Sequence, residues 1–261
     1  MKVLMIGDIV GKPGRTILYN FLEKNRENYD YIIVNGENAA SGFGITEKIC
    51  VEFFEKGVDV ITSGNHIWDK KEIYEYIKKE KRLLKPFNYP KTTPGNGYII
   101  LEKNNKTLAV ISLQGRALMP INVDCPFTLA KDLTDEIKNI TKNIIIDFHA
   151  EATAEKIALA KYLDGDVSLI CGTHTHVQTA DETILENGTG YITDLGMTGS
   201  FSGVIGTNKD IIIQKFLTSL PQRHEISEGD IKLNGIEAEI CEETGKCKNI
   251  NRILWSNEWN F

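Results

Sequence analysis

The sequence of 261 residues has no apolar run that approaches the roughly 18 residues needed to cross a bilayer. Its first residues reach Asp8 and a Gly/Pro turn too early for a secretory signal segment. The five cysteines are few, odd in number and scattered along the chain, so they predict no disulfide framework. We therefore expect a cytoplasmic protein without a membrane span.

An excess of positive charge is also lacking. Lys and Arg number 30 against 36 Asp and Glu, which leaves a net charge of −6. This balance argues against a protein that holds long nucleic acid by its overall charge. A small phosphorylated ligand remains compatible with it, because such a ligand needs only local positive charge.

What the sequence does contain is an alternation of apolar runs and helical patterns, typical of an α/β protein with strands buried on both faces. No linker or internal repeat interrupts it, so residues 1–261 are expected to form a single domain. A β-hairpin is predicted at 97–115 with Asn104 and Asn105 at its turn, and a β-rich tail follows residue 230. Strands are predicted at 2–7, 29–36, 58–64, 142–149 and 166–173, and helices at 13–28, 45–57, 68–84 and 153–165.

Polar residues able to bind metals or transfer protons directly follow the predicted strands. Open α/β sheets place their functional sites at the carboxyl ends of strands, so these positions are informative. Four of the chain's five histidines lie there, whereas His224 does not and is expected at the surface. The strand-end residues are Asp8, Glu37, Asn38, Asn65, His66, His149, His174 and His176.

These residues predict a metal site. His174 and His176 are expected in an extended segment, where alternate side chains face the same point. Nitrogen and oxygen ligands without a converging cysteine favour iron, manganese or zinc. The candidate ligands are too many for one four-coordinate ion, which predicts two metals sharing a bridging carboxylate, the arrangement used in phosphoester hydrolysis. They are Asp8, Glu37, Asn38, Asn65, His149, His174 and His176.

Several further features lie beside these candidates. The loops 41–45 and 196–206 are rich in Gly, Ser and Thr, and are either plain turns or segments that approach the site. Asp147, Glu151 and Asp194 are candidates for orienting a ligand histidine, although Asp194 is equally suited to capping a helix. Trp255 and Trp259 are expected in the core or an interface.

The order of these motifs resembles that of the calcineurin-like metallophosphoesterases. That family has an Asp after the first strand, a carboxylate after the second, GNH after the third, then a lone His and G-x-H-x-H. The matching segments here cover about residues 1–205 and read GDIVG, NGENAA, GNHIWD, DFHAE and GTHTHVQTAD. The resemblance implies a four-layer α/β/β/α sandwich with two mixed sheets.

Two departures from the general pattern narrow the resemblance. Val10 stands where the family usually has a ligand histidine, and Glu37-Asn38 replaces the usual Gly-Asp. This combination is similar to the YmdB-type bacterial 2′,3′-cyclic-nucleotide 2′-phosphodiesterases, in which the Asn after the Glu supplies the missing ligand. The resemblance implies two metal ions bridged by Glu37, iron or manganese first and zinc as an alternative. Asp8, Glu37, Asn38 and His176 would hold one, and Glu37, Asn65, His149 and His174 the other.

The resemblance also implies a reaction, in which a hydroxide bridging the metals opens a 2′,3′-cyclic nucleotide to the 3′-phosphate. His66 is expected to be catalytic and to protonate the leaving oxygen, since imidazole gives up a proton near neutral pH. A packing role for His66 is the alternative. Two other functions stay open: a broader phosphomonoesterase or phosphodiesterase, and a metal-dependent protein that senses nucleotides. A homo-oligomer is suggested by the family, but no sequence pattern indicates one.

Overall fold

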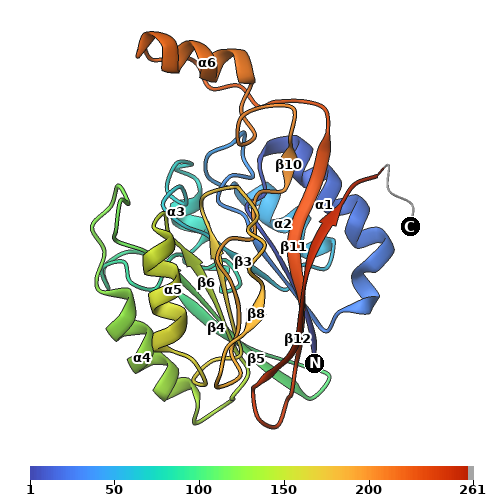
Figure 1. Ribbon diagram of the computed structural model, residues 1–261, viewed down its shortest axis with the longest axis vertical. Helices are drawn as coiled ribbons and strands as arrows, with labels where there is room; N and C mark the ends of the chain where they lie inside the picture. The colour runs from blue at the N-terminus through green and yellow to red at the C-terminus, as the bar shows by residue number, and fades with distance from the viewer. Residues whose placement is uncertain (258–261) are drawn as a thin grey trace.

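Two β-sheets lie face to face at the centre of the structure, a computed structural model that describes residues 1–257 (Figure 1). The first sheet has the strand order β10 (Gly199–Ser200), β11 (Ile231–Ile240), β1 (Lys2–Ile6), β2 (Tyr31–Asn35) and β3 (Val60–Thr62), with β12 (Cys247–Trp255) paired to β11. β1, β2 and β3 run parallel, whereas β11 is antiparallel to β1, so this sheet is mixed.

The second sheet is mixed as well. Its strand order is β4 (Tyr98–Lys103), β5 (Lys106–Gln114), β6 (Ile144–His149), β7 (Leu169–Thr173), β9 (Gly190–Ile192) and β8 (Thr183–Ile184). The four strands from β5 to β9 are parallel, and the edge strands β4 and β8 are antiparallel to their neighbours. The carboxyl ends of the parallel strands therefore meet along one edge of the sheet.

Helices cover the outer faces of both sheets. Buried side chains of α1 (Gly11–Asn25) and α2 (Glu47–Glu55) pack on the first sheet. Those of α4 (Pro126–Ile137) and α5 (Thr153–Tyr162) pack on the second. A third apolar cluster fills the space between the sheets. The predicted four-layer sandwich with two mixed sheets is confirmed. Within residues 1–257, no helix is long and apolar enough to cross a membrane.

Local sequence signals explain several element boundaries. Thr46 caps α2 through its hydroxyl, which accepts a hydrogen bond from the backbone N–H of Ile49 at 3.3 Å. Gly57 follows that helix with a φ of +92°, a conformation that glycine adopts without strain. Asn104 and Asn105 form the predicted hairpin turn with φ angles of 53° and 59°.

The prediction of a long helix at 68–84 is wrong. Only α3 (Ile73–Tyr76) is helical there. Leu83 and Leu84 are fully buried in extended backbone, where the N–H of Leu84 donates to the carbonyl of Ile61 on β3 at 2.8 Å. The apolar end of the segment is thus more stable beside the first sheet than on a helix whose Lys-rich middle has nothing to pack.

The second half of the chain holds two helices that the sequence analysis did not assign. α4 packs into the core, whereas α6 (Lys209–Thr218) stands off the body at the top of Figure 1. The β-rich tail is confirmed as β11 and β12. Trp255, expected in the core or an interface, is half-buried and packs edge-on against Phe21 with ring centroids 5.4 Å apart, while Trp259 lies outside the described residues.

Candidate metal centre

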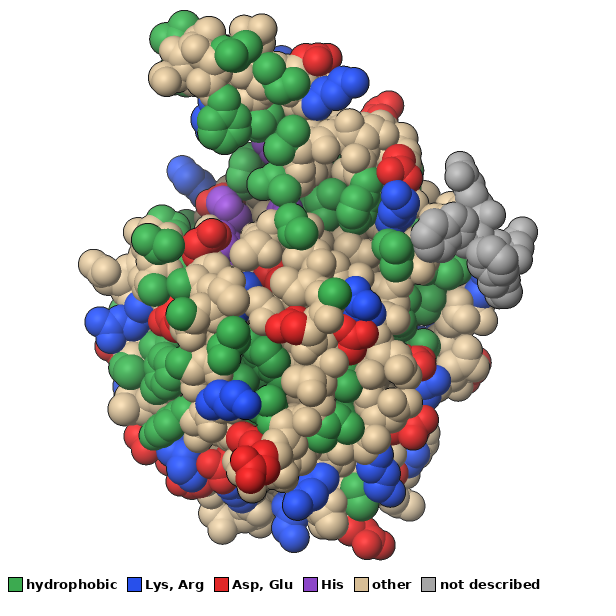
Figure 2. All heavy atoms as spheres, in the orientation of Figure 1, with side chains coloured by type: hydrophobic (Ala, Val, Ile, Leu, Met, Phe, Trp, Pro, Cys, Tyr) green, Lys and Arg blue, Asp and Glu red, His purple; other side chains and the backbone are tan. Residues whose placement is uncertain are grey.

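The strand-end residues of both sheets meet at one edge of the sandwich. β1, β2 and β3 lead into the first group, and β6 and β7 lead into the second. Contacts between side chains of the two groups cross from one sheet to the other, and histidine side chains are visible in the notch below α6 (Figure 2). The first group is Asp8, Glu37, Asn38 and Asn65, and the second is His149, His174 and His176.

The tightest part of the cluster is Glu37, His149 and His174. Each offers one ligand atom, and these atoms all lie within 4.8 Å of one another. The Nε2 atom of His149 is 3.0 Å from Oε1 of Glu37, 3.0 Å from Nδ1 of His174 and 3.1 Å from Oδ1 of Asn65. Four potential ligand atoms therefore surround one small volume.

Asp8 extends the cluster toward His176. Its Oδ1 atom is 3.9 Å from Nε2 of His176 and 4.0 Å from Nδ1 of His149. This Oδ1 is buried and has no hydrogen-bond partner among the described residues, and the same holds for Oδ1 of Asn38. Buried acceptors without donors are costly, and a cation is a partner that fits both oxygens. The donor set and these two oxygens therefore suit oxygen- and nitrogen-binding metals.

The backbone of His174 and His176 differs from the expectation. An extended segment was predicted, but the φ angles of these residues are +98° and +66°, in the left-handed region. Such conformations cost about 1–3 kcal/mol each and persist only where the surroundings impose them. The buried Asp194 carboxylate accepts hydrogen bonds from the N–H groups of Thr175 at 3.1 Å and Gly196 at 2.8 Å. It thereby holds the turn that brings both imidazoles to the site.

A buried polar layer beneath the cluster orients His149. The Asp147 carboxylate accepts hydrogen bonds from the side chains of Asn35 at 3.0 Å, Thr173 at 2.7 Å and Thr62. Because the Thr173 hydroxyl donates to Asp147, it is an acceptor for Nδ1–H of His149 at 2.9 Å. This arrangement leaves Nε2 of His149 facing the cluster. Asp147 thus orients the histidine through Thr173.

The other two orienting candidates differ in their roles. Glu151 contacts the ring directly, with its carboxylate 3.3 Å from Nε2 of His174. Asp194 caps no helix; it holds the turn between the histidines and pairs with Lys156.

Charge in the site is unevenly distributed. Burial disfavours the charged form of His149, but Glu37 and Asp8 override this effect and raise its pKa to about 9. Burial also opposes ionisation of Glu37, yet His149 lowers the pKa of that carboxyl to about 2. Burial and the charge of His149 together lower the pKa of His174 to about 3, so that ring is neutral. The carboxylates therefore create a strong demand for positive charge, which a divalent cation meets.

His66 lies at the rim of the cluster, with its side chain 29% exposed. Its backbone N–H donates to Oε2 of Glu37 at 3.1 Å, and its Nδ1 is 2.7 Å from Oδ2 of Asp69. Asp69 therefore fixes the orientation of the ring through Nδ1. The other ring nitrogen, Nε2, is the one that remains for a substrate.

His224, expected at the surface, is half-buried and belongs to the wall of the site. Its ring packs on Phe43 at 4.5 Å between centroids, and Phe43 packs on His66 at 4.9 Å. Gly42 permits this approach, because a Cβ atom there would lie 2.4 Å from Nε2 of His224. Gly42 and Gly44, which flank Phe43, were the sequence signal that another side chain packs closely against this loop.

Both glycine-rich loops reach the site. The loop 41–45 supplies Phe43, and in the loop 196–206 the Ile205 carbonyl accepts a hydrogen bond from Nδ1 of His176 at 3.2 Å. They are therefore more than connecting turns.

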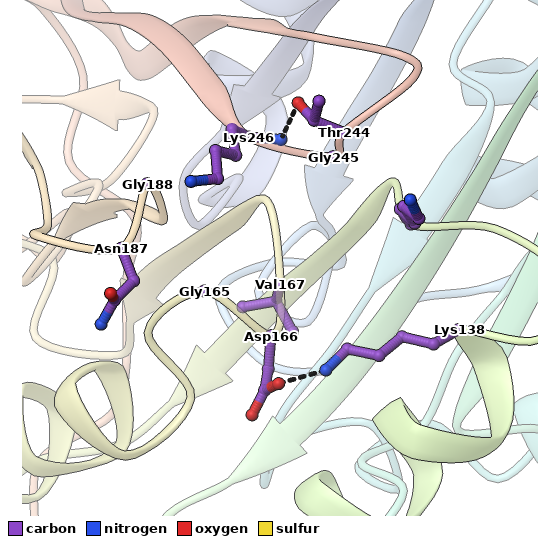
Figure 3. Close-up of a pocket in the computed structure, with 10 residues that line it drawn as sticks. Lys138, Gly165, Asp166, Val167, Asn187, Gly188, Thr244, Gly245 and Lys246 are labelled. Atoms are coloured by element: carbon purple, nitrogen blue, oxygen red, sulfur yellow. Dashed lines mark hydrogen bonds and ion pairs between the residues drawn. The ribbon is translucent and has the colours of Figure 1, made fainter.

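A separate cavity of about 270 Å³ lies at the amino-terminal edge of the second sheet, away from these residues (Figure 3). Lys138, Asp166 and Lys246 are among its lining residues, and Lys138 is paired with Asp166. None of the candidate ligands lines it.

The fold and the cluster together define a phosphoesterase of the metallophosphoesterase class. Solved nucleotidases share this fold at 13–14% identity, with TM-scores of 0.62 and 0.59, a likeness that concerns the fold alone. A family model described as YmdB-like protein matches residues 4–253. The chain belongs to the YmdB-like family.

Similar proteins cover nearly the whole chain. The 2′,3′-cyclic-nucleotide 2′-phosphodiesterase of Bacillus subtilis (strain 168) is 48% identical, covering 100% of this chain and 99% of that protein. A crystal structure of a hypothetical protein from Thermus thermophilus has a TM-score of 0.92 at 39% identity, covering 98% of this chain and 99% of that one. A crystal structure of a novel phosphatase from Mycoplasma pneumoniae has a TM-score of 0.91 at 35% identity, covering 98% and 93%.

Proposed function

We propose that this protein is a dinuclear metal phosphodiesterase that hydrolyses 2′,3′-cyclic nucleotides to 3′-phosphates. The observation that carries the proposal is the convergence of Glu37, His149 and His174 beside the unpartnered Oδ1 of Asp8. The Oδ1 atom of Asn38, which follows Glu37 in the chain, is also buried without a hydrogen-bond donor. The name of the Bacillus subtilis relative, 48% identical over its full length, supplies the substrate class.

Two groups of residues would hold the metals, with Glu37 common to both. An anionic bridge between neutral Asn and His ligands leaves net positive charge toward a phosphate. Bound iron or manganese ions would supply an activated water molecule and neutralise the phosphoryl oxygens. The first group is Asp8, Glu37, Asn38 and His176, and the second is Glu37, Asn65, His149 and His174.

His66 is the proposed general acid. Its contact with Asp69 holds Nδ1, so that Nε2 can point at a leaving oxygen. Phe43 packs on the His66 ring, and His224 packs on Phe43. These contacts hold the ring at the rim of the cluster.

The bond changes follow from this arrangement. A water oxygen forms a bond to phosphorus and loses one proton to solvent, while the bond from phosphorus to the 2′-oxygen breaks. Nε2 of His66 gives that oxygen its proton, and the ring then regains a proton from solvent. The phosphate stays on the 3′-oxygen.

A broader phosphoesterase is the second candidate. The names of other relatives support it, since the Mycoplasma pneumoniae protein is described as a putative phosphatase/phosphodiesterase at 36% identity. A nucleotide-sensing protein without turnover is less well supported, because binding alone does not need an oriented proton donor.

Activity and metal content measured in one preparation test the proposal. Protein purified without added metal is analysed for bound elements and assayed with 2′,3′-cyclic AMP, p-nitrophenyl phosphate and bis(p-nitrophenyl) phosphate. We expect iron or manganese, and the 3′-phosphate as the product from the cyclic nucleotide. A 2′-phosphate product, or fast monoester cleavage without cyclic-nucleotide turnover, contradicts the proposal.

Substitution of His66 tests the mechanism. His66→Ala is expected to lower turnover of the cyclic nucleotide about 10²–10⁴-fold with metal content unchanged. The loss should be much smaller with bis(p-nitrophenyl) phosphate, whose leaving group departs as a stable anion. Asp69→Asn is the matched variant, which keeps the ring and should show an intermediate loss. Equal losses on both substrates would show that His66 is not a general acid.

A further inference from the structure

A strained turn lies against the candidate metal centre. The backbone N–H groups of Val204 and Thr207 each donate to the other residue's carbonyl, at 2.8 and 2.9 Å, and close a two-residue hairpin around Ile205 and Gly206. The φ angles of these two central residues are +44° and +89°, as in a type I′ turn. Asparagine or glycine usually occupies the first central position, so isoleucine is an unusual residue there.

The fold alone does not account for isoleucine at this turn. A β-branched residue with a positive φ is a strained outlier, and strain of this kind clusters at active sites and ligand contacts. The side chain of Ile205 is 51% exposed, so it gains little from packing within its own chain. Asparagine at this position would relieve the strain and remove an exposed apolar side chain. The isoleucine therefore lowers stability, which suggests that its side chain serves the function.

The turn is fixed beside the candidate ligands. The carbonyl of Ile205 accepts a hydrogen bond from Nδ1 of His176 at 3.2 Å, and Nε2 of the same ring lies 3.9 Å from Oδ1 of Asp8. One imidazole ring therefore separates the turn from the candidate ligand atoms. Gly206 allows the turn to pack closely, because a Cβ atom there would lie 2.7 Å from Cγ1 of Val10.

The residues next to this turn are also apolar and exposed. Val204, which precedes Ile205 in the hairpin, is 37% exposed, and Val177, which follows His176, is 61% exposed. Figure 2 shows apolar side chains next to the histidines in the notch below α6. Proteins bind the flat faces of nucleobases with aromatic or apolar side chains. This side of the site therefore suits the base of a nucleotide better than its phosphate or its ribose.

We propose that Ile205 is a specificity-determining residue whose side chain contacts the nucleobase of the substrate. The inference rests on the proposed function, in which the phosphate of a 2′,3′-cyclic nucleotide binds at the metal centre. The ribose separates that phosphate from the base, much as one imidazole ring separates the candidate ligand atoms from the turn. The strained hairpin thus has two tasks, because its carbonyl orients His176 while its side chain meets the base.

Kinetics with two cyclic phosphates test this assignment. The full chain is assayed in the presence of manganese with 2′,3′-cyclic AMP and with glycerol 1,2-cyclic phosphate, which has the same five-membered phosphate ring but no base. We expect Ile205→Asn to raise KM for 2′,3′-cyclic AMP about tenfold, as for a lost apolar contact, and to leave KM for the glycerol compound unchanged. The same variant should melt at a higher temperature than the wild type, because asparagine suits the turn.

Two further variants control the comparison. Ile205→Leu keeps an apolar side chain of the same volume, so its KM for 2′,3′-cyclic AMP should stay close to the wild-type value. Ile140→Asn makes the same chemical change at an exposed position on the loop after α4, and it should leave both KM values unchanged.

Three results would overturn the assignment. Equal changes in KM with both substrates, or no change with either, would show that Ile205 does not contact the base. A loss of bound metal from Ile205→Asn would show that the turn acts through His176 instead. A wild-type protein that does not turn over 2′,3′-cyclic AMP would contradict the proposed function itself, and the assignment with it.

Discussion

Replacement of Lys156 by methionine should be among the most destabilising single changes in this protein. Lys156 lies on α5 and is 1% exposed. Its Nζ donates to Oδ2 of Asp194 at 2.7 Å and to the carbonyl of Thr173 at 2.8 Å. Methionine fills a similar volume but leaves the Asp194 charge buried without its cation. Removing one partner of a buried ion pair costs about 3–5 kcal/mol.

Urea-induced and thermal unfolding at pH 7 measure this loss directly. For a chain of this size we expect the melting temperature of Lys156→Met to fall by roughly 10 °C. Lys161→Met on the exposed side of the same helix is the control, and should change the free energy of unfolding by less than about 0.5 kcal/mol. Metal affinity should fall together with stability, because Asp194 holds the turn between His174 and His176. A cost below about 1 kcal/mol for Lys156→Met would refute the reasoning.

Three further predictions concern separate parts of the molecule. Thr46→Ala removes the cap of α2 and should cost about 1 kcal/mol in urea unfolding, whereas Thr46→Ser should cost much less. Burial opposes ionisation of Asp30, but hydrogen bonds from Lys106 and from the Lys2 N–H outweigh burial and lower the pKa of Asp30 below 3.8. The ionised carboxylate therefore stabilises the folded protein above pH 3.8, and this stabilisation is lost when Asp30 is protonated in acid. Lys106→Met should therefore be less stable than the wild type at pH 7 and nearly equal to it at pH 2, and an equal gap at both values would contradict the assignment. Chelation should lower both activity and melting temperature, with manganese restoring both, and an unchanged melting temperature would argue against bound metal.

The candidate site could be found in the sequence because its residues follow short buried strands. An apolar run such as KVLMIG indicates a strand without knowledge of its neighbours, and Asp8 comes directly after it. Parallel strands then bring their carboxyl ends together, so position after a strand predicts proximity in space. Glu37 and His149 lie at such ends in different sheets, and they are 3.0 Å apart because the two sheets pack face to face with these ends at the same edge.

Features that depend on long-range packing could not be found in this way. The left-handed backbone of His174 and His176 is imposed by the turn that Asp194 holds, and no local pattern predicts it. His224 follows an exposed helix in a polar segment, and the glycines beside Phe43 permit its packing there without indicating His224 as the partner. The prediction of a helix at 68–84 was wrong because Leu83 and Leu84 are buried in extended backbone beside β3, to which the N–H of Leu84 donates a hydrogen bond.

The division of the candidate ligands between the two sheets has a consequence for the stability of the protein in a cell that is short of metal. Asp8 and Glu37 belong to one layer, and His149 and His174 to the other. An ion held by both layers would cross-link them. Like any ligand of the native state, it would stabilise only the folded form in which the two layers are packed together. Metal starvation would then separate the carboxyl edges first and expose the loops there to proteases. The concentration of the enzyme, as well as its activity, would follow the metal supply.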